Sequence, residues 1–369
     1  MKNVVKFGHS EAAAIAIVFV GVKAFLGYPR VVIELGSTAA WLVVLISGMV
    51  GIGAWLVISA LLARFPGKSI MVITELVLGP FLGIGVNIIF FLYVMITNGI
   101  LLRQFSEAII LTTLPEAPIS SLTFLFIIPV WLAAYLGIEA ISRSAYISLP
   151  FITAGVTAVL LALYPYWNPL MLLPLLGEGI FPTVKYGFLS STVFGEIFIL
   201  AVLAPFFAFT QKKLKNVGLF SLGFVMVFFI LIVNVYLMVF PLPVATENLL
   251  PFYQLARTIY LGRYFQRVEA VFVLFWTFTA FLRLSLGIIV AAFILQDAFK
   301  LPYYRPLLPA LCVLAFSLAL TPADVMQNAF IEYKIRLIYG WLFSLALPCG
   351  IWAVALLRRK GEGHEGENT

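Results

Sequence analysis

Long apolar runs recur along almost the whole chain and leave it few ways to fold. Each holds about 20 residues or more, the length that a helix needs to cross a hydrocarbon layer roughly 30 Å thick. Hydrophobic residues make up 63% of the 369 residues and charged residues only 11%, too few to cover a water-soluble globule. The pattern predicts an all-α integral membrane protein: one transmembrane domain over 1–360, then a disordered cytoplasmic tail over 361–369.

Polar breaks divide the apolar runs into ten predicted spans. These are 10–33, 38–63, 80–112, 119–139, 145–164, 184–210, 217–240, 267–297, 304–321 and 335–357. The third and eighth exceed the length of a perpendicular crossing, so we expect them to be tilted. Lys and Arg are more numerous in the loops on the side of the amino terminus, which predicts that both termini are cytoplasmic. Lys334 and Arg336 are assigned to the outer loops.

The first predicted span is interrupted between Gly21 and Arg30. Gly21 and Gly27 loosen the backbone, and Pro29 removes a hydrogen-bond donor. Lys23 places an ammonium group where the surrounding sequence predicts hydrocarbon. Backbone that leaves helical geometry within a bilayer must find partners or line a cavity. We therefore predict a broken membrane helix here.

The sixth predicted span has a matching interruption, Gly187–Glu196, in which glycines, hydroxyls and a carboxylate stand amid apolar residues. Short structured connections, 70–78 and 254–261, follow the second and seventh spans and end at glycines, Gly79 and Gly262. The two halves thus indicate a five-plus-five inverted repeat with discontinuous helices one and six. Paired interruptions of this kind point to a substrate site at the midplane, because opened turns expose amide donors and carbonyl acceptors.

Lys23 and Glu196 are the two charged candidates within these interruptions. Lys23 has a functional interpretation, in which it replaces a coupling cation or holds a substrate carboxylate, and a structural one. In the structural interpretation it reaches the interface or neutralises Glu196 or Glu107. Glu196 is expected to accept a substrate amino group or relay a proton, the alternative being a cap on the broken helix.

The other site candidates lie on the two interruptions and on the spans that we expect to face them. The predicted binding set is Gly21, Val22, Lys23, Ala24, Phe25, Tyr93, Thr97, Asn98, Ser190, Ser191, Thr192, Phe194, Glu196, Thr277 and Phe281. The hydroxyl groups could orient a small polar ligand or satisfy backbone carbonyls. Arg283, on the same span as Thr277, requires a partner that the sequence does not identify.

Two ion pairs follow from spacing alone. Arg103 and Glu107 are four residues apart on the third span and share a helix face, which predicts a structural pair. Glu139 and Arg143 have the same spacing at a predicted helix end, where a gate is possible and an ordinary surface pair is the favoured interpretation.

Several classes of function lack support in the sequence. There is no phosphate-binding loop, nucleophile elbow, dinucleotide fingerprint or metal-ligand cluster, so we predict no enzyme activity, catalytic residue, cofactor or metal. The net charge of +7 resides mostly in short loops, as topology determinants do, and predicts no nucleic-acid binding. Cys312 and Cys349 both lie within apolar segments and are interpreted as small core residues.

Several stretches resemble the spore germination permease family, the B-subunit type of germinant receptors, within the amino acid/polyamine/organocation superfamily of transporters. They are Phe7–Glu11, Tyr28–Arg30, Leu62–Ser69, Arg103–Glu107, Leu136–Arg143 and Pro169–Gly179, in this order over most of the chain. Lys23 departs from the pattern, because related first helices more often carry a small or apolar residue there.

The resemblance implies a ten-helix inverted-repeat fold that holds a small amino acid or similar solute between helices one, three, six and eight. It also implies partner subunits, one with a large soluble domain and one a lipoprotein, in the inner spore membrane, with membrane lipid around the chain. The main alternative is an autonomous amino acid transporter coupled to protons or sodium. A purely structural membrane scaffold is a third possibility, which the paired interruptions disfavour.

Overall fold

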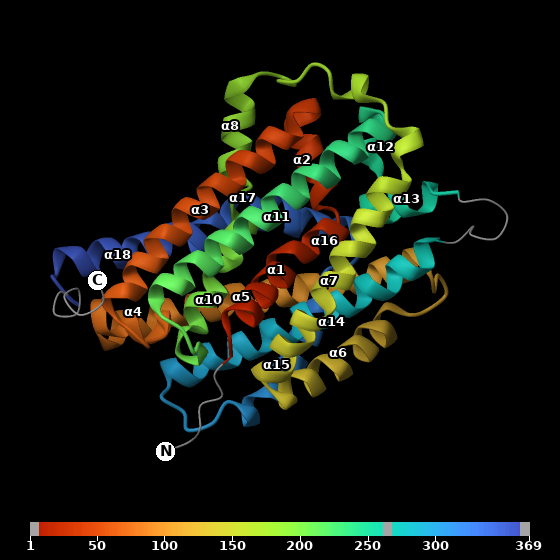
Figure 1. The fold of residues 1–369 in the computed structure, drawn as a ribbon. Coiled ribbons are helices and arrows are strands. Elements are labelled where there is room, and N and C mark those ends of the chain that lie inside the picture. The colour runs from red at the N-terminus through yellow and green to blue at the C-terminus, as the bar shows by residue number, and fades with distance from the viewer. Residues whose placement is uncertain (1–6, 261–267, 362–369) are drawn as a thin grey trace.

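The computed structural model describes residues 7–260 and 268–361, and all secondary-structure elements longer than a single bridge within these ranges are helices (Figure 1). An isolated bridge joins Phe7 to Phe207. Leu261 and Gly262, the predicted end of the second short connection, lie outside the described residues, as does the tail beyond 361.

The helices follow one another closely along the chain. They are α1 His9–Gly21, α2 Tyr28–Gly36, α3 Ala40–Arg64, α4 Ile70–Leu78, α5 Pro80–Thr112, α6 Ile119–Leu136, α7 Ile138–Ala162, α8 Ile180–Leu189, α9 Thr192–Gly195, α10 Ile199–Val202, α11 Gln211–Val239, α12 Leu242–Glu247, α13 Pro251–Thr258, α14 Val268–Ala298, α15 Leu308–Ala319, α16 Val325–Phe330, α17 Leu337–Tyr339 and α18 Leu347–Leu357.

Eight helical segments in the described residues are long and apolar enough to cross a membrane, by length and composition. They are Tyr28–Arg64, Pro80–Thr112, Ile119–Leu136, Ile138–Ala162, Ile180–Val202, Gln211–Val239, Phe272–Ala298 and Val325–Leu357. Arg305–Ala319 is a shorter apolar helix, and α1 supplies the first half of the interrupted first span. The all-α membrane fold is confirmed, while the count of ten crossings stays a prediction.

Long helices pack around α5 and α14 to form one bundle (Figure 1). α14 contacts α5, α6 and α7, and α3 packs along α11. α1 lies against both α7 and α11, which places its carboxyl end in the middle of the bundle. The short helices α4 and α13 stand after the second and seventh spans, where the predicted repeat requires them.

Several predicted boundaries were wrong: the fifth, seventh and last spans begin at Ile138, Gln211 and Val325, and the sixth ends at Val202. The fourth span ends at Leu136, because Gly137 adopts a φ of +100° and α7 begins directly after it. The last helix begins at Val325 rather than near 335, since the Asp324 side chain caps it by accepting from the Gln327 amide at 2.7 Å. Charged residues that resembled a loop therefore lie inside a helix.

Candidate functional site

Both predicted interruptions exist and are buried. The first membrane helix changes from α1 to a tight 3-10 turn over Val22–Phe25 before α2 begins. The sixth changes from α8 to the short α9, then to a 3-10 turn over Glu196–Phe198 and α10. Lys23 and Glu196 thus stand at the two breaks.

A buried network of ions joins these breaks to two further helices. We define the ionic cluster as Lys23, Glu196, Arg283, Glu332 and Arg336, each no more than 6% exposed. Lys23 donates to Glu196 Oε1, which also accepts from Arg336 Nη1 at 2.8 Å. Arg283 Nη2 donates to the other Glu196 oxygen at 3.2 Å, and Arg336 donates to both oxygens of Glu332.

The ionic cluster is rich in donors and short of acceptors. Its three cations stand against two carboxylates, so the sum is one positive charge in excess. A guanidinium group has five N–H donors and an ammonium group has three. Arg283 and Arg336 each use three of their donors in hydrogen bonds to the described protein, and Lys23 uses one. Both Glu196 oxygens are already occupied. An unbalanced buried charge is costly, so the cluster favours an additional anionic acceptor.

Arg283 ties the ionic cluster to the third predicted span. Its Nε donates to the Phe19 carbonyl at 3.1 Å, and its guanidinium stacks over the Phe19 ring at 3.3 Å from the centroid. Its Nη1 donates to Asn98 Oδ1 at 3.2 Å, and the Asn98 amide donates to the Leu284 carbonyl at 3.1 Å. The partners of Arg283 that the sequence left open are therefore Glu196, Asn98 and the backbone of α1.

The predicted hydroxyl groups divide into two kinds. Thr192 donates to the Leu337 carbonyl at 2.9 Å, which fastens the sixth helix to the last one. Tyr93, Thr97, Ser190 and Ser191 are buried, and their hydroxyls have no hydrogen-bond partner in the described protein. Buried hydroxyls of this second kind can serve a polar ligand.

The predicted aromatic residues make packing contacts. Phe25 lies edge-on to Phe252 and Phe272, and Phe281 packs on Phe126 at 4.9 Å between ring centroids. Phe194 contacts Phe229 at 5.8 Å. The remaining members of the predicted set are Gly21, Val22 and Ala24 around the first break and the half-buried Thr277 on α14. A role in binding for these residues stays a prediction.

A second polar group lies beside the first break. Arg103 Nε donates to Glu107 Oε1 at 2.5 Å, which confirms the predicted pair, and Asn328 Nδ2 donates to Glu107 Oε2 at 2.9 Å. A carboxylate only accepts, so this bond fixes the amide of Asn328 with its Oδ1 turned away. That Oδ1 and Gln104 Oε1 are buried acceptors without a partner in the described protein.

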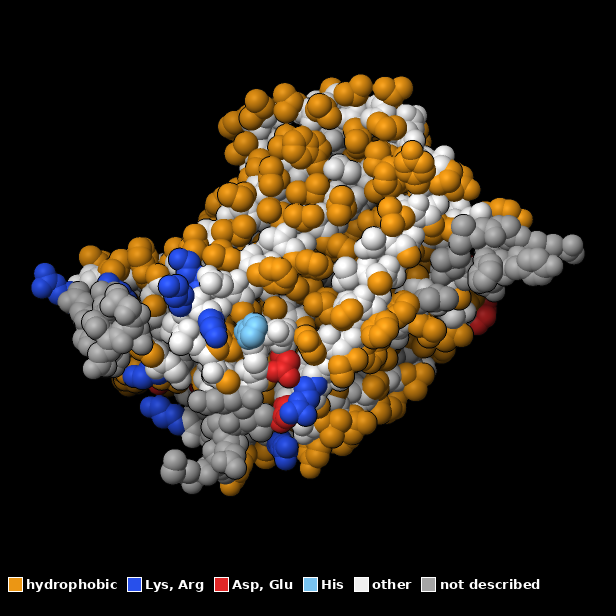
Figure 2. Space-filling model, viewed as in Figure 1, with side chains coloured by type: hydrophobic (Ala, Val, Ile, Leu, Met, Phe, Trp, Pro, Cys, Tyr) orange, Lys and Arg blue, Asp and Glu red, His pale blue; other side chains and the backbone are white. Residues whose placement is uncertain are grey.

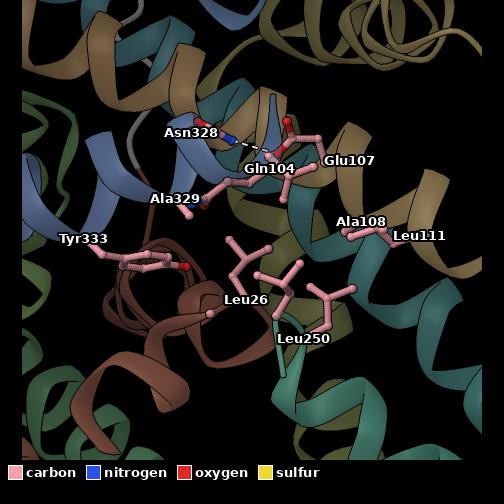
Figure 3. Close-up of a pocket in the computed structure, with 12 residues that line it drawn as sticks. Leu26, Gln104, Glu107, Ala108, Leu111, Leu250, Asn328, Ala329 and Tyr333 are labelled. Atoms are coloured by element: carbon pink, nitrogen blue, oxygen red, sulfur yellow. Dashed lines mark hydrogen bonds between the residues drawn. The ribbon is translucent and has the colours of Figure 1, made fainter. Parts of the chain in front are cut away.

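These groups line a small cavity of about 40 Å³, which we call the Glu107 cavity. Its wall includes Leu26, Gly27, Gln104, Glu107, Asn328 and Tyr333 (Figure 3). A Cβ at Gly27 would lie 2.3 Å from the Tyr333 hydroxyl, so only glycine permits this close approach. Tyr333 follows Glu332 directly, which places the Glu107 cavity next to the ionic cluster in the chain.

Glu139 and Arg143 form an ordinary surface pair, 36% and 66% exposed, as predicted. Cys312 is buried and Cys349 half-buried, and both are free thiols.

Sequence reasoning missed Glu332 and Arg336. Arg336 was assigned to an outer loop, yet it is buried and its helix continues through a π-helical stretch, Ile331–Arg336. A second π-helical stretch, Leu342–Ala346, follows it, so the last helix is irregular as well. Such stretches often mark functional sites. Glu332 and Arg336 are four residues apart, the same spacing that predicted the Arg103–Glu107 ion pair, and this spacing could have indicated that they pair on one helix.

Two broken helices that meet at a buried polar centre define a membrane protein of the transporter fold. A solved structure of Mhp1, a nucleobase-cation-symport-1 family transporter, in a closed conformation with bromovinylhydantoin bound, matches with a TM-score of 0.70. The match covers 96% of this chain and 79% of that one at 12% identity, and it shows the shared fold.

The family is given by sequence. A family model described as spore germination protein matches residues 10–327, and the chain belongs to this family. Two Bacillus subtilis (strain 168) proteins are similar over nearly their whole length. Spore germination protein KB is 22% identical over 97% of this chain and 99% of its own, and spore germination protein YndE is 21% identical over 97% and 98%.

Proposed function

We propose that this protein is the amino-acid-binding membrane subunit of a spore germinant receptor, with its site at the ionic cluster between the broken helices. The observation that carries the proposal is the excess of one positive charge and of unused donors in that cluster. A ligand carboxylate supplies the missing negative charge and acceptors.

The surroundings suit the other end of an amino acid. The Glu107 cavity offers the acceptors Gln104 Oε1 and Asn328 Oδ1, which match the N–H donors of an ammonium group. The small cavity and the buried hydroxyls of Tyr93 and Thr97 favour a ligand with a short side chain.

Sensing requires that the ligand favours one arrangement of the bundle over another. A carboxylate that engages Lys23 and Arg336 competes with Glu196 for their donors. These contacts join the first, sixth and last helices, so a change in them alters how three helices pack. Partner subunits, one with a large soluble domain and one a lipoprotein, would read this change in the inner spore membrane, with both termini cytoplasmic.

Thermal stabilisation of the purified protein across a panel of amino acids tests the proposal, because a ligand that binds the folded state raises its apparent stability. We expect at least one small amino acid to stabilise the protein and its decarboxylated amine to fail. Lys23→Met should abolish the stabilisation while the protein stays folded. Lys334→Met, which removes a half-exposed lysine paired with Glu34, is the matched control and should respond as wild type does. An unchanged ligand response in Lys23→Met contradicts the proposed site.

An autonomous transporter coupled to protons or sodium is the second candidate, favoured by the fold shared with Mhp1. Uptake of the stabilising amino acid into vesicles that contain only this protein separates the two. Concentrative uptake that follows an imposed ion gradient supports the transporter, whereas binding without uptake supports the receptor subunit.

A further inference from the structure

α1, α7 and α11 lie on the near face of the bundle in Figure 1, and α1 contacts both of the others. A groove on the outside of the bundle runs between α7 and α11, with α1 as its floor at one end. Two cavities of about 470 and 560 Å³ make it up, and Phe220 lines both. α1 packs against α7 and against α11, whereas α7 and α11 have little direct contact with each other. We call this feature the α7–α11 groove.

The walls of the α7–α11 groove are apolar stripes on two helices. The α11 wall includes Val217, Phe220, Phe224, Val227, Leu231 and Val235, spaced three or four residues apart and therefore on one helix face. On the α7 wall, Thr153 and Thr157 donate to carbonyls of their own helix, both at 2.8 Å, so neither hydroxyl needs a partner in the groove. From 213 to 235 the groove extends for roughly 33 Å, similar to the thickness of the hydrocarbon layer.

One end of the α7–α11 groove is polar and basic. His9, Ser10, Tyr146, Lys213 and Asn216 line it, and the exposed Lys212 and Lys215 lie on the same first turns of α11. Figure 2 shows this face, where basic side chains gather at one end and hydrophobic side chains cover most of the rest.

The carboxylates near this end are already engaged. Glu11 accepts from the Gly8 amide at 2.6 Å, and Glu139 is paired with Arg143. Lys213 has no carboxylate partner among the described residues. The Glu11 hydrogen bond to a neutral amide leaves its charge in place, but Lys212, Lys213 and Lys215 outnumber it. The end of the groove therefore presents a net positive charge to any ligand whose apolar part lies along α11.

We infer that the α7–α11 groove binds one anionic phospholipid, with its phosphate at Lys213 and an acyl chain along the face from Val217 to Val227. The charge at one end and the apolar stripe beyond it match the two parts of such a lipid. A partner membrane helix would match the stripe, but it would leave Lys213 without an anion. Because Ala13, Ala14 and Ile17 of α1 form the floor, the lipid contacts the helix that leads to Lys23.

Native mass spectrometry of the full-length protein tests this inference, with phosphatidylglycerol and phosphatidylcholine of identical acyl chains offered at equal concentration. We expect wild type to retain one phosphatidylglycerol in preference to phosphatidylcholine. Lys213→Gln should lower that retention about fivefold, the factor that one basic residue contributes near an anionic membrane surface. Lys212→Gln makes the same change of charge on an exposed neighbour that does not line the groove, and it should retain the lipid within about twofold of wild type.

Two further measurements locate the lipid. Ala13→Leu narrows the floor without changing charge and should lower retention of phosphatidylglycerol, while its melting temperature shows that the fold is kept. Glycerol phosphate, which has the headgroup chemistry but no acyl chain, should not displace the lipid. Four results would each overturn the inference: equal retention of the two lipids, an equal loss of phosphatidylglycerol retention in Lys212→Gln and Lys213→Gln, unchanged retention in Ala13→Leu, or displacement of the lipid by glycerol phosphate.

Discussion

The excess charge in the ionic cluster makes Lys23 and Glu196 unequal partners, although they form one ion pair. Glu196→Gln removes the carboxylate that accepts from Lys23, Arg283 and Arg336. It leaves three cations against Glu332 alone. Lys23→Met instead leaves Arg283 and Arg336 opposite Glu196 and Glu332, two charges of each sign.

The expected energies differ accordingly. Removing one partner of a buried ion pair costs on the order of 3–5 kcal/mol, because the other charge is left uncompensated. Glu196→Gln should destabilise the protein by about that amount. Replacing a buried ion by an apolar side chain of similar volume is often neutral when the remaining charges balance. Lys23→Met should therefore lie within about 1 kcal/mol of wild type, and the double variant should be more stable than Glu196→Gln alone.

Thermal unfolding in detergent, followed with a thiol-reactive fluorogenic dye, measures this order, because unfolding exposes the buried Cys312. The expected ranking of melting temperatures is wild type and Lys23→Met highest, then the double variant, then Glu196→Gln. Equal losses for the two single variants would mean that the pair behaves as an isolated salt bridge. The argument from net charge would then be refuted.

Three further predictions follow from local geometry and use the same unfolding assay. Gly27→Ala places a Cβ 2.3 Å from the Tyr333 hydroxyl and should lower the melting temperature. The control, Gly53→Ala, has open space around its Cβ and should leave the melting temperature unchanged, so equal effects of the two variants would contradict the close contact between Gly27 and Tyr333. Asn328→Leu removes the donor to Glu107 Oε2 and should cost about 1–3 kcal/mol, as for other buried groups left unpaired; a neutral result would mean that the bond contributes nothing. Arg103→Gln leaves buried Glu107 uncompensated and should cost about 3–5 kcal/mol, against less than about 1 kcal/mol for the exposed Arg143→Gln; similar costs would show that burial does not set the energy.

The sequence was informative where a local pattern determines the structure. Glycine, proline and a charge within an apolar run predicted the break at Val22–Phe25, and hydroxyls with a carboxylate predicted the one around Glu196. Spacing of four residues on one helix was enough to pair Arg103 with Glu107 and Glu139 with Arg143. Each of these inferences depends on residues close together in the chain.

The partners of Arg283 could not be predicted in the same way. Glu196 is 87 residues away and Asn98 is 185 residues away, and only the packing of the bundle brings them together. Glu332 and Arg336 were missed for a different reason. Their charges resembled a loop beside the predicted start of a span, while in the structure each neutralises the other and both fit inside an irregular helix.

The irregular last helix changes what the broken helices can do. Gly195 leaves no room for a Cβ beside Ser344, and Gly340 leaves none beside Thr192, so the sixth and last helices approach closely next to the ionic cluster. Arg336, which also binds Glu332 on its own helix, connects the same two helices through Glu196. A ligand carboxylate that draws Arg336 away from Glu196 therefore loosens the link between two tightly packed helices, while Glu332 keeps the guanidinium compensated. Such a rearrangement costs less than exposing a bare charge, which is why we place the response to ligand at the last helix as well as at the first and sixth.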